Sequence, residues 1–106
     1  MDVVIVTTTW PTEADAARAA ETVVAERLAA CAQVTGPIRS VFRWEGKVDR
    51  ATEWYCHLKT TAERYPALEA RLRALHPYEV PEIVAVPVVA GRAGYLAWVR
   101  EQVRER

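Results

Sequence analysis

An imidazole, a phenol and two carboxylates lie within seven consecutive residues of this chain. They belong to residues 76–83, which we call the elbow and which read His76-Pro77-Tyr78-Glu79-Val80-Pro81-Glu82-Ile83. Imidazole is the commonest metal ligand in proteins, and carboxylate oxygens suit divalent cations. His76, Glu79 and Glu82 are therefore the candidate metal ligands. Each proline disfavours helical geometry in the residue before it, so the elbow predicts a bend between a helix and a strand.

Each candidate ligand also has a structural interpretation. His76 follows a predicted helix, where an imidazolium would complement the negative helix end and donate hydrogen bonds to free carbonyls. Glu79 and Glu82 can instead form ion pairs, because the chain has twelve arginines. The sequence leaves both alternatives open.

The two cysteines and the single serine give little support to other chemistry. Cys31 and Cys56 are isolated in apolar context without a CxxC pair, so we expect small buried hydrophobes with free thiols rather than soft metal ligands. Ser40 has no histidine near it in sequence, and a glycine-rich phosphate loop is absent. We therefore expect no catalytic residues, no organic cofactor and no enzymatic activity.

Composition predicts a single domain over residues 1–106 with a core of its own, because 51% of the 106 residues are hydrophobic. Basic and acidic residues number 14 each, so no net charge attracts nucleic acid. We find no apolar segment of membrane-spanning length and no basic stretch typical of a signal peptide. Together with two free thiols, these features predict a cytoplasmic protein without a membrane or nucleic-acid partner.

Hydrophobic periodicity predicts the elements of the first half. Residues 3–6 are β-branched and continuous, as in a strand buried on both faces. An apolar stripe that follows Thr12 predicts a helix continuing to Cys31. Alternating polarity around a turn at residues 45–47 then predicts a long antiparallel hairpin, with Trp44 and Trp54 as cross-strand partners.

The second half contains two further helices and one strand. Leucine spacing predicts a short helix that has Pro66 in its first turn, since proline suits that position, and that ends at His76-Pro77. Residues 83–89 predict a strand, and Pro87 within it indicates an edge strand or a strand end. An apolar stripe over residues 96–103 predicts a terminal helix.

This order of elements predicts an α+β fold, a ferredoxin-like βαββαβ sandwich with an added C-terminal helix. Right-handed crossovers would place both crossover helices on one face of a four-stranded antiparallel sheet. The other face would keep apolar and aromatic side chains without a cover. Exposed patches of that size indicate a partner, and we expect that partner to be further copies of the chain.

Several segments, in this order, resemble the CutA family of divalent-cation tolerance proteins. The resemblance extends over nearly the whole chain and is carried by the elbow together with Glu26-Arg27-Leu28-Ala29-Ala30-Cys31-Ala32, Ser40-Val41-Phe42-Arg43-Trp44-Glu45-Gly46, Lys59-Thr60-Thr61 and Tyr95-Leu96-Ala97-Trp98.

The resemblance implies a tight cytoplasmic homotrimer, similar in shape to PII signalling proteins, that acts in tolerance of divalent metals. It implies Cu²⁺ or another divalent cation as the ligand. Copper binding in the family is linked to a cysteine near the end of the first strand and to histidines just before the Pro-Tyr pair. Thr7 stands at the first position, and Leu75 precedes His76 at the second, so only His76 of that set is present.

Three functional hypotheses follow. The first is a non-enzymatic trimer that binds divalent metal weakly in metal-ion response. The second is a PII-like signalling or small-ligand module with incidental metal binding. The third is a mainly structural trimer.

Overall fold

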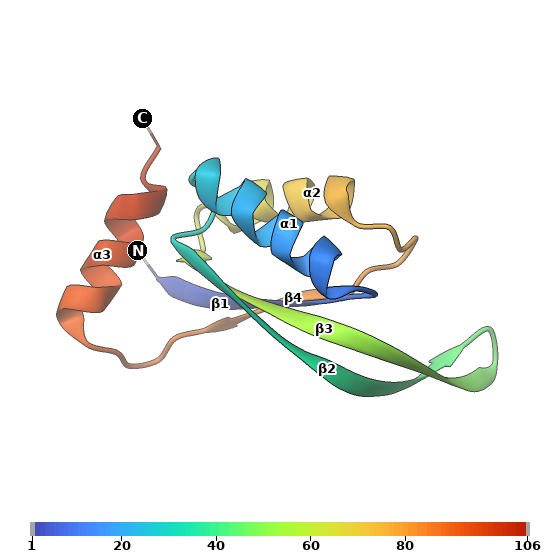
Figure 1. Ribbon diagram of the computed structural model, residues 1–106. Helices are drawn as coiled ribbons and strands as arrows, with labels where there is room; N and C mark the ends of the chain where they lie inside the picture. Colours follow the sequence, from blue (N-terminus) through green and yellow to red (C-terminus); the bar gives the residue numbers. More distant parts are fainter. Residues whose placement is uncertain (1, 106) are drawn as a thin grey trace.

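The computed structural model describes residues 2–105, which form four strands and three helices (Figure 1). In chain order these are β1 (Val3–Trp10), α1 (Glu13–Ala25), β2 (Cys31–Trp44), β3 (Lys47–Thr61), α2 (Tyr65–Leu75), β4 (Ile83–Pro87) and α3 (Ala93–Val103). The predicted βαββαβ order with an added helix is confirmed.

The strands form one antiparallel sheet in the order β2-β3-β1-β4. Helices α1 and α2 lie together on one face of this sheet, and α3 lies beyond its end beside the start of β1 (Figure 1). This is the ferredoxin-like arrangement. β4 is an edge strand that ends at Pro87, which confirms the interpretation of that proline.

The main core lies between the sheet and the two crossover helices. Val6 and Leu58 from the central strands, Val23 of α1 and Leu68 of α2 are all fully buried in it. A second, smaller cluster joins α3 to the start of β1 through Val3, Ala30, Val99 and Val103. The added helix therefore has its own apolar contact with the sheet.

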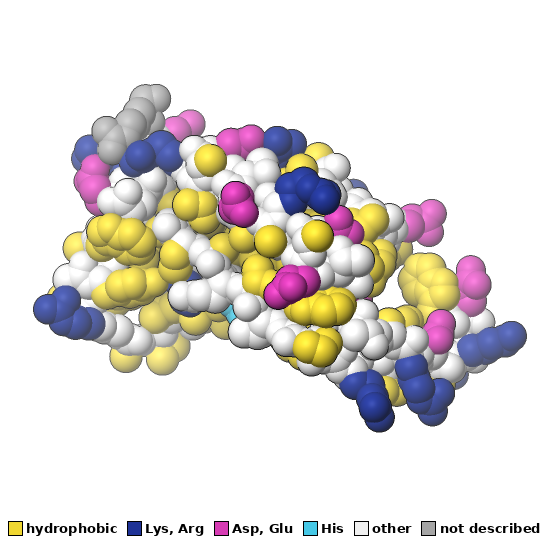
Figure 2. Space-filling model, in the orientation of Figure 1, with side chains coloured by type: hydrophobic (Ala, Val, Ile, Leu, Met, Phe, Trp, Pro, Cys, Tyr) yellow, Lys and Arg dark blue, Asp and Glu magenta, His cyan; other side chains and the backbone are white. Residues whose placement is uncertain are grey.

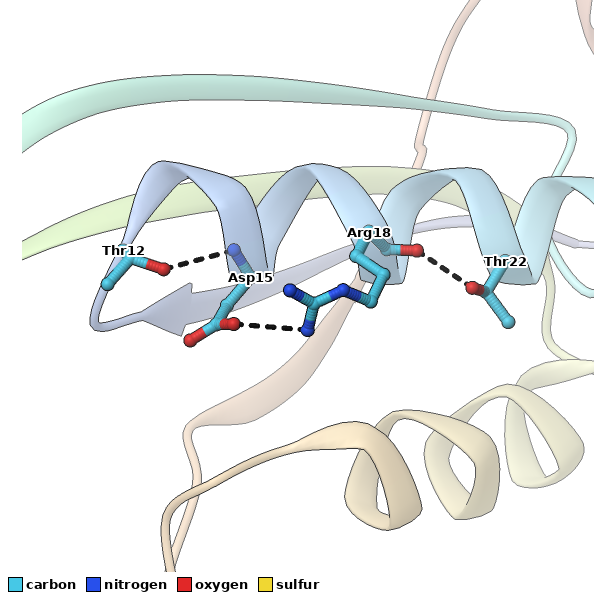
Figure 3. Close-up of polar contacts among 4 residues, drawn as sticks. All are labelled: Thr12, Asp15, Arg18 and Thr22. Atoms are coloured by element: carbon cyan, nitrogen blue, oxygen red, sulfur yellow. Dashed lines mark hydrogen bonds and ion pairs between the residues drawn. The ribbon is translucent and has the colours of Figure 1, made fainter.

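Helix α1 begins where expected but ends earlier than the prediction. The Thr12 hydroxyl accepts a hydrogen bond from the Asp15 N–H at 3.0 Å, the N-cap that the spacing indicated (Figure 3). The helix stops at Ala25 because Arg27 adopts a left-handed φ of 63°. Bonds from the Arg27 and Leu28 N–H groups to carbonyls of the last turn then close a Schellman motif. A helix continuing to Cys31 was wrong, and Cys31 instead begins β2.

The hairpin of β2 and β3 is confirmed, but its register differs from the prediction. Glu45 and Gly46 form a two-residue turn with φ values of 51° and 78°, so Trp44 pairs with Lys47. Trp54 lies opposite Trp10 of β1. The pairing of the two hairpin tryptophans was therefore wrong, because a tight turn brings only its immediate neighbours together.

The half of the hairpin nearest the turn extends beyond the other strands. We call this part, residues 38–53, the arm; in Figure 1 it projects away from the helices. Figure 2 shows Lys and Arg side chains gathered towards its tip. It also carries the exposed side chains of Val41, Phe42, Trp44 and Val48. A two-stranded ribbon with exposed apolar groups has little stability of its own in water.

The sheet face opposite α1 and α2 is the face that was expected to lack a cover. We call it the open face. Its side chains come from alternate positions of the strands: Ile5, Thr7, Tyr55, His57, Lys59, Val84 and Val86. Val84 and Val86 are exposed, and Tyr95 and Trp98 of α3 are exposed as well. Among the described residues, no helix combines the length and hydropathy needed to cross a membrane.

Candidate functional site

His76 is the buried anchor of the elbow, with 9% of its surface exposed. Its ring stacks on Trp10 with centroids 4.0 Å apart. The Tyr78 N–H donates to Nδ1 at 3.1 Å, and Nε2 lies 2.7 Å from the Thr9 carbonyl oxygen. Because a backbone N–H can only donate, Nδ1 must accept, and Nε2 therefore carries the proton that it donates to Thr9. The imidazole thus joins the end of α2 to β1.

Burial keeps this imidazole neutral. It lowers the pKa of His76 from its ordinary value, and this effect exceeds the opposing effects of the Thr9 carbonyl and of the carboxylates of Glu53 and Asp15. The interpretation of His76 as an imidazolium capping α2 was therefore wrong, since the ring is neutral and donates to β1. Both ring nitrogens are engaged, so a metal ion could bind His76 only after one of these hydrogen bonds is broken.

Glu79 and Glu82 lie on the exposed part of the elbow. Neither carboxylate forms an ion pair within residues 2–105, so the alternative of arginine partners is absent from the described chain. The described residues also contain no group of three or more His, Cys, Asp or Glu side chains able to hold one ion. The metal site at His76, Glu79 and Glu82 therefore stays a prediction. Within the described chain, these three side chains do not form such a group.

A groove of about 950 Å³ separates the arm from the elbow, and we call it the elbow groove. Its volume is in the range of small-molecule sites. Aromatic rings, aliphatic side chains, four carboxylates and one guanidinium line it. The lining residues are Thr9, Ile38, Arg39, Ser40, Val41, Phe42, Trp44, Asp49, Glu53, Tyr55, Pro77, Tyr78, Glu79, Val80 and Glu82.

Glu53 is the lining residue that sequence reasoning missed. The residue is 7% exposed, and its Oε2 accepts a hydrogen bond from the Tyr78 hydroxyl at 2.7 Å. Burial and this carboxylate together raise the pKa of Tyr78, so the phenol stays protonated and donates. The only signal in the sequence is the position of Glu53 in the strand alternation, which places it on the same face of β3 as Tyr55 and His57.

A bulge in β2 brings the arm's apolar side chains to the groove. The register shifts between Thr35 and Ile38, so that Ile38 pairs with Glu53 and the following even-numbered residues of β2 share its face. Gly36 lies in this bulge, where a Cβ would collide with the Trp54 ring. Only glycine fits there. The bulge thus sets which residues of the arm face the elbow.

The open face holds the position at which the resemblance implied a metal-binding cysteine. Thr7 occupies it, and its Oγ1 is hydrogen-bonded to His57 Nδ1 at 3.3 Å. Both cysteines are free, as predicted. Burial raises the pKa of Cys56 to about 12, which makes its thiol unreactive. Cys31, however, is only half-buried, and its Sγ lies 3.3 Å from the Tyr95 hydroxyl, so its predicted burial was wrong.

The ferredoxin-like core, the projecting hairpin and the elbow define a class of small α+β proteins. Comparison with known proteins identifies the family: the model of the CutA1 divalent ion tolerance protein matches residues 4–102. The chain belongs to this family, which confirms the resemblance found in the sequence.

Individual relatives agree with this assignment. The "Divalent-cation tolerance protein CutA" of Thermus thermophilus is 44% identical over 97 residues, which cover 92% of this chain and 94% of that protein. "Protein CutA" of Homo sapiens is 42% identical over 88% of this chain, which spans about half (52%) of the human protein. The crystal structure of CutA1 from Oryza sativa superposes with a TM-score of 0.95 at 35% identity, covering 100% of this chain and 97% of that chain.

Proposed function

We propose that this chain acts in divalent-cation tolerance as a non-enzymatic homotrimer that binds Cu²⁺, or another divalent cation, weakly. Membership of the divalent-cation tolerance family carries the proposal. The open face supports the trimer, because its exposed valines and the apolar arm need a cover that a single chain lacks. Copies of the same chain provide that cover with a closed symmetry.

Weak metal binding agrees with the ligands that the elbow offers. Glu79 and Glu82 are free of ion pairs within the described chain, and His76 would have to break a hydrogen bond in order to bind. We propose that these three residues contribute to a site of micromolar or weaker affinity, about −8 kcal/mol or less favourable. By the usual divalent order, such a site should bind Cu²⁺ ahead of Zn²⁺.

We also propose that the protein works in the cytoplasm. The two free thiols support this location, because a reducing compartment keeps cysteines unpaired.

Calorimetric titration with Cu²⁺ at pH 7 tests the metal site. We expect the wild type to bind, and the double variant Glu79→Gln/Glu82→Gln to bind at least about tenfold more weakly, because two charged ligands are lost. His76→Asn should also weaken binding if the imidazole rearranges to bind metal. Glu63→Gln is the matched control, since this exposed carboxylate lies outside the groove.

The titration tests both whether the elbow residues bind the metal and whether the purified protein binds it at all. Equal binding by the wild type and all elbow variants would rule out the elbow as the site. Absence of binding by the wild type would contradict metal binding by the purified protein.

A further inference from the structure

One face of the arm carries positive charge only. Three cross-strand pairs make up this face, which we call the basic face: Arg39 with Thr52, Val41 with Arg50, and Arg43 with Val48. Paired residues of neighbouring strands point to the same side, so three guanidinium groups share this face and no carboxylate lies on it. All six residues are exposed, and none of the three arginines forms an ion pair within residues 2–105. The basic face therefore lacks a countercharge in the described part of its own chain.

The basic face points away from the elbow of its own chain. Ile38 and Glu53 pair on the opposite face of the arm, which lines the elbow groove, and Arg43 and Arg50 are not part of the groove wall. The arm is also long, because residues 38–44 of β2 span roughly 20 Å at about 3.3 Å per residue. In Figure 1 this ribbon projects beyond the helices and the other strands. It can therefore carry its arginines to another molecule.

The elbow has the complementary charge. Glu79 and Glu82 are exposed and form no ion pair within the described chain. The elbow contains no lysine or arginine, and His76 stays neutral because burial lowers its pKa. Val80 lies between the two carboxylates and is 65% exposed, while Val41 on the basic face is 60% exposed. Each surface thus combines exposed valine with unpaired charge, and the two charges are opposite in sign.

We propose that the basic face of one copy docks on the elbow of the next copy. This inference rests on the proposed trimer and identifies two surfaces that meet in it. The contact joins different surfaces of the two copies, so it repeats head to tail and closes into a ring of three. The guanidinium groups would pair with Glu79 and Glu82, which is the geometry that arginine and carboxylate favour, and the valines would pack between the charges. Metal binding at the elbow would then be weak, because a cation must displace a guanidinium group.

Reversal of the charges on each surface tests the proposal. Arg39→Glu/Arg43→Glu/Arg50→Glu makes the basic face acidic, and Glu79→Lys/Glu82→Lys makes the elbow basic. Either variant brings like charges together in every contact of the ring, so its trimer should dissociate at a concentration at least about a hundredfold higher than the wild type. The combination of all these substitutions restores opposite signs and should return the dissociation midpoint to within about tenfold of the wild type.

Sedimentation of the fluorescently labelled full chain, from picomolar to micromolar concentration, measures the dissociation midpoint. A chelator in the buffer removes any contribution from bound metal. The matched controls are Glu21→Lys/Glu63→Lys and Arg18→Glu/Arg73→Glu, which reverse the charges of exposed residues outside the arm and the elbow. Both controls should keep the wild-type midpoint. Circular dichroism checks that each variant retains the fold.

The pattern over the variants decides the proposal. Weaker association of both reversed variants, recovery in the combined variant and unchanged controls support it. Wild-type association of either reversed variant would place that surface outside the interface and overturn the proposal, and so would a combined variant as weak as the reversed ones. Where a reversed variant loses the fold, Arg43→Gln/Arg50→Gln takes its place, with an expected shift of about tenfold. A trimeric wild type with unaffected variants contradicts this inference alone, whereas a monomeric wild type contradicts the proposed trimer itself.

Discussion

His76 links three parts of the fold through one side chain. Its hydrogen bonds to Thr9 and Tyr78 connect β1 to the elbow, and Tyr78 in turn holds Glu53 at the base of the arm. The candidate site is therefore a chain of contacts, in which the histidine positions the tyrosine and the tyrosine positions the buried carboxylate. The sequence places His76 beside Tyr78, but the connection to Glu53 spans 25 residues.

This linkage makes stability depend on pH. The folded chain keeps His76 neutral, with a pKa below its ordinary value of 6.5. Below about pH 6.5 the unfolded chain therefore binds a proton that the folded chain excludes, and the free energy of unfolding falls as pH decreases. The loss approaches about 1.4 kcal/mol per pH unit while only the unfolded histidine is protonated.

His76→Gln should remove this contribution. We expect it to cost about 1–3 kcal/mol at pH 7, through the lost stacking and at least one buried hydrogen bond, and to flatten stability between pH 7 and pH 5. Urea unfolding at several pH values measures both effects. His57→Gln is the matched control on the open face, and an unchanged pH slope in His76→Gln would show that the titrating group lies elsewhere.

The site residues that sequence reasoning found and those it missed differ in how far apart they lie along the chain. His76, Glu79 and Glu82 fall within one segment, so their types and spacing can be read directly. Glu53 comes from the middle of the chain on β3, and Trp44 reaches the same groove through the bulge at Gly36, which changes the face on which β2 presents its side chains. A polarity pattern does not reveal such a one-residue shift.

At the scale of elements, the type and order of the strands and helices could be predicted, and their ends less well. The Schellman motif at Arg27 ended α1 early without the glycine that usually marks such a position. The apolar stripe continues past this point because Leu28 still packs against the core, although it is no longer helical. The apolar spacing of the sequence therefore continues beyond the residue at which the backbone stops being helical.

The start of α1 gives a prediction at this scale. Thr12→Ala should destabilise the protein by about 1 kcal/mol, because the Asp15 N–H loses its acceptor at the N-cap (Figure 3). Thr12→Ser keeps the hydroxyl and should retain most of the stability. The midpoint of urea unfolding compares the two, and equal losses in both variants would assign the effect to the threonine methyl group rather than to the cap.

At the scale of the whole molecule, apolar side chains are distributed over more surface than a single sandwich can cover. The open face, the arm and the outer side of α3 each expose large hydrophobic residues, and the α3 end shows many of them in Figure 2. The fold explains why: both crossover helices occupy one face of the sheet, and α3 packs at its end rather than across the opposite face.

The proposed trimer makes the open face a buried interface, and this leads to a direct test. Light scattering of the wild type should give three times the mass of the chain at micromolar concentration. Val86→Glu should reduce the mass to that of one chain, because Val86 is 54% exposed on the open face opposite Ile5, and an unpaired carboxylate buried there would cost several kcal/mol. Val89→Glu introduces the same charge at a loop position that is 94% exposed and should keep the trimer. A monomeric wild type would contradict the assembly itself, whereas a trimeric Val86→Glu variant would place the interface on another surface, with the arm as the next candidate.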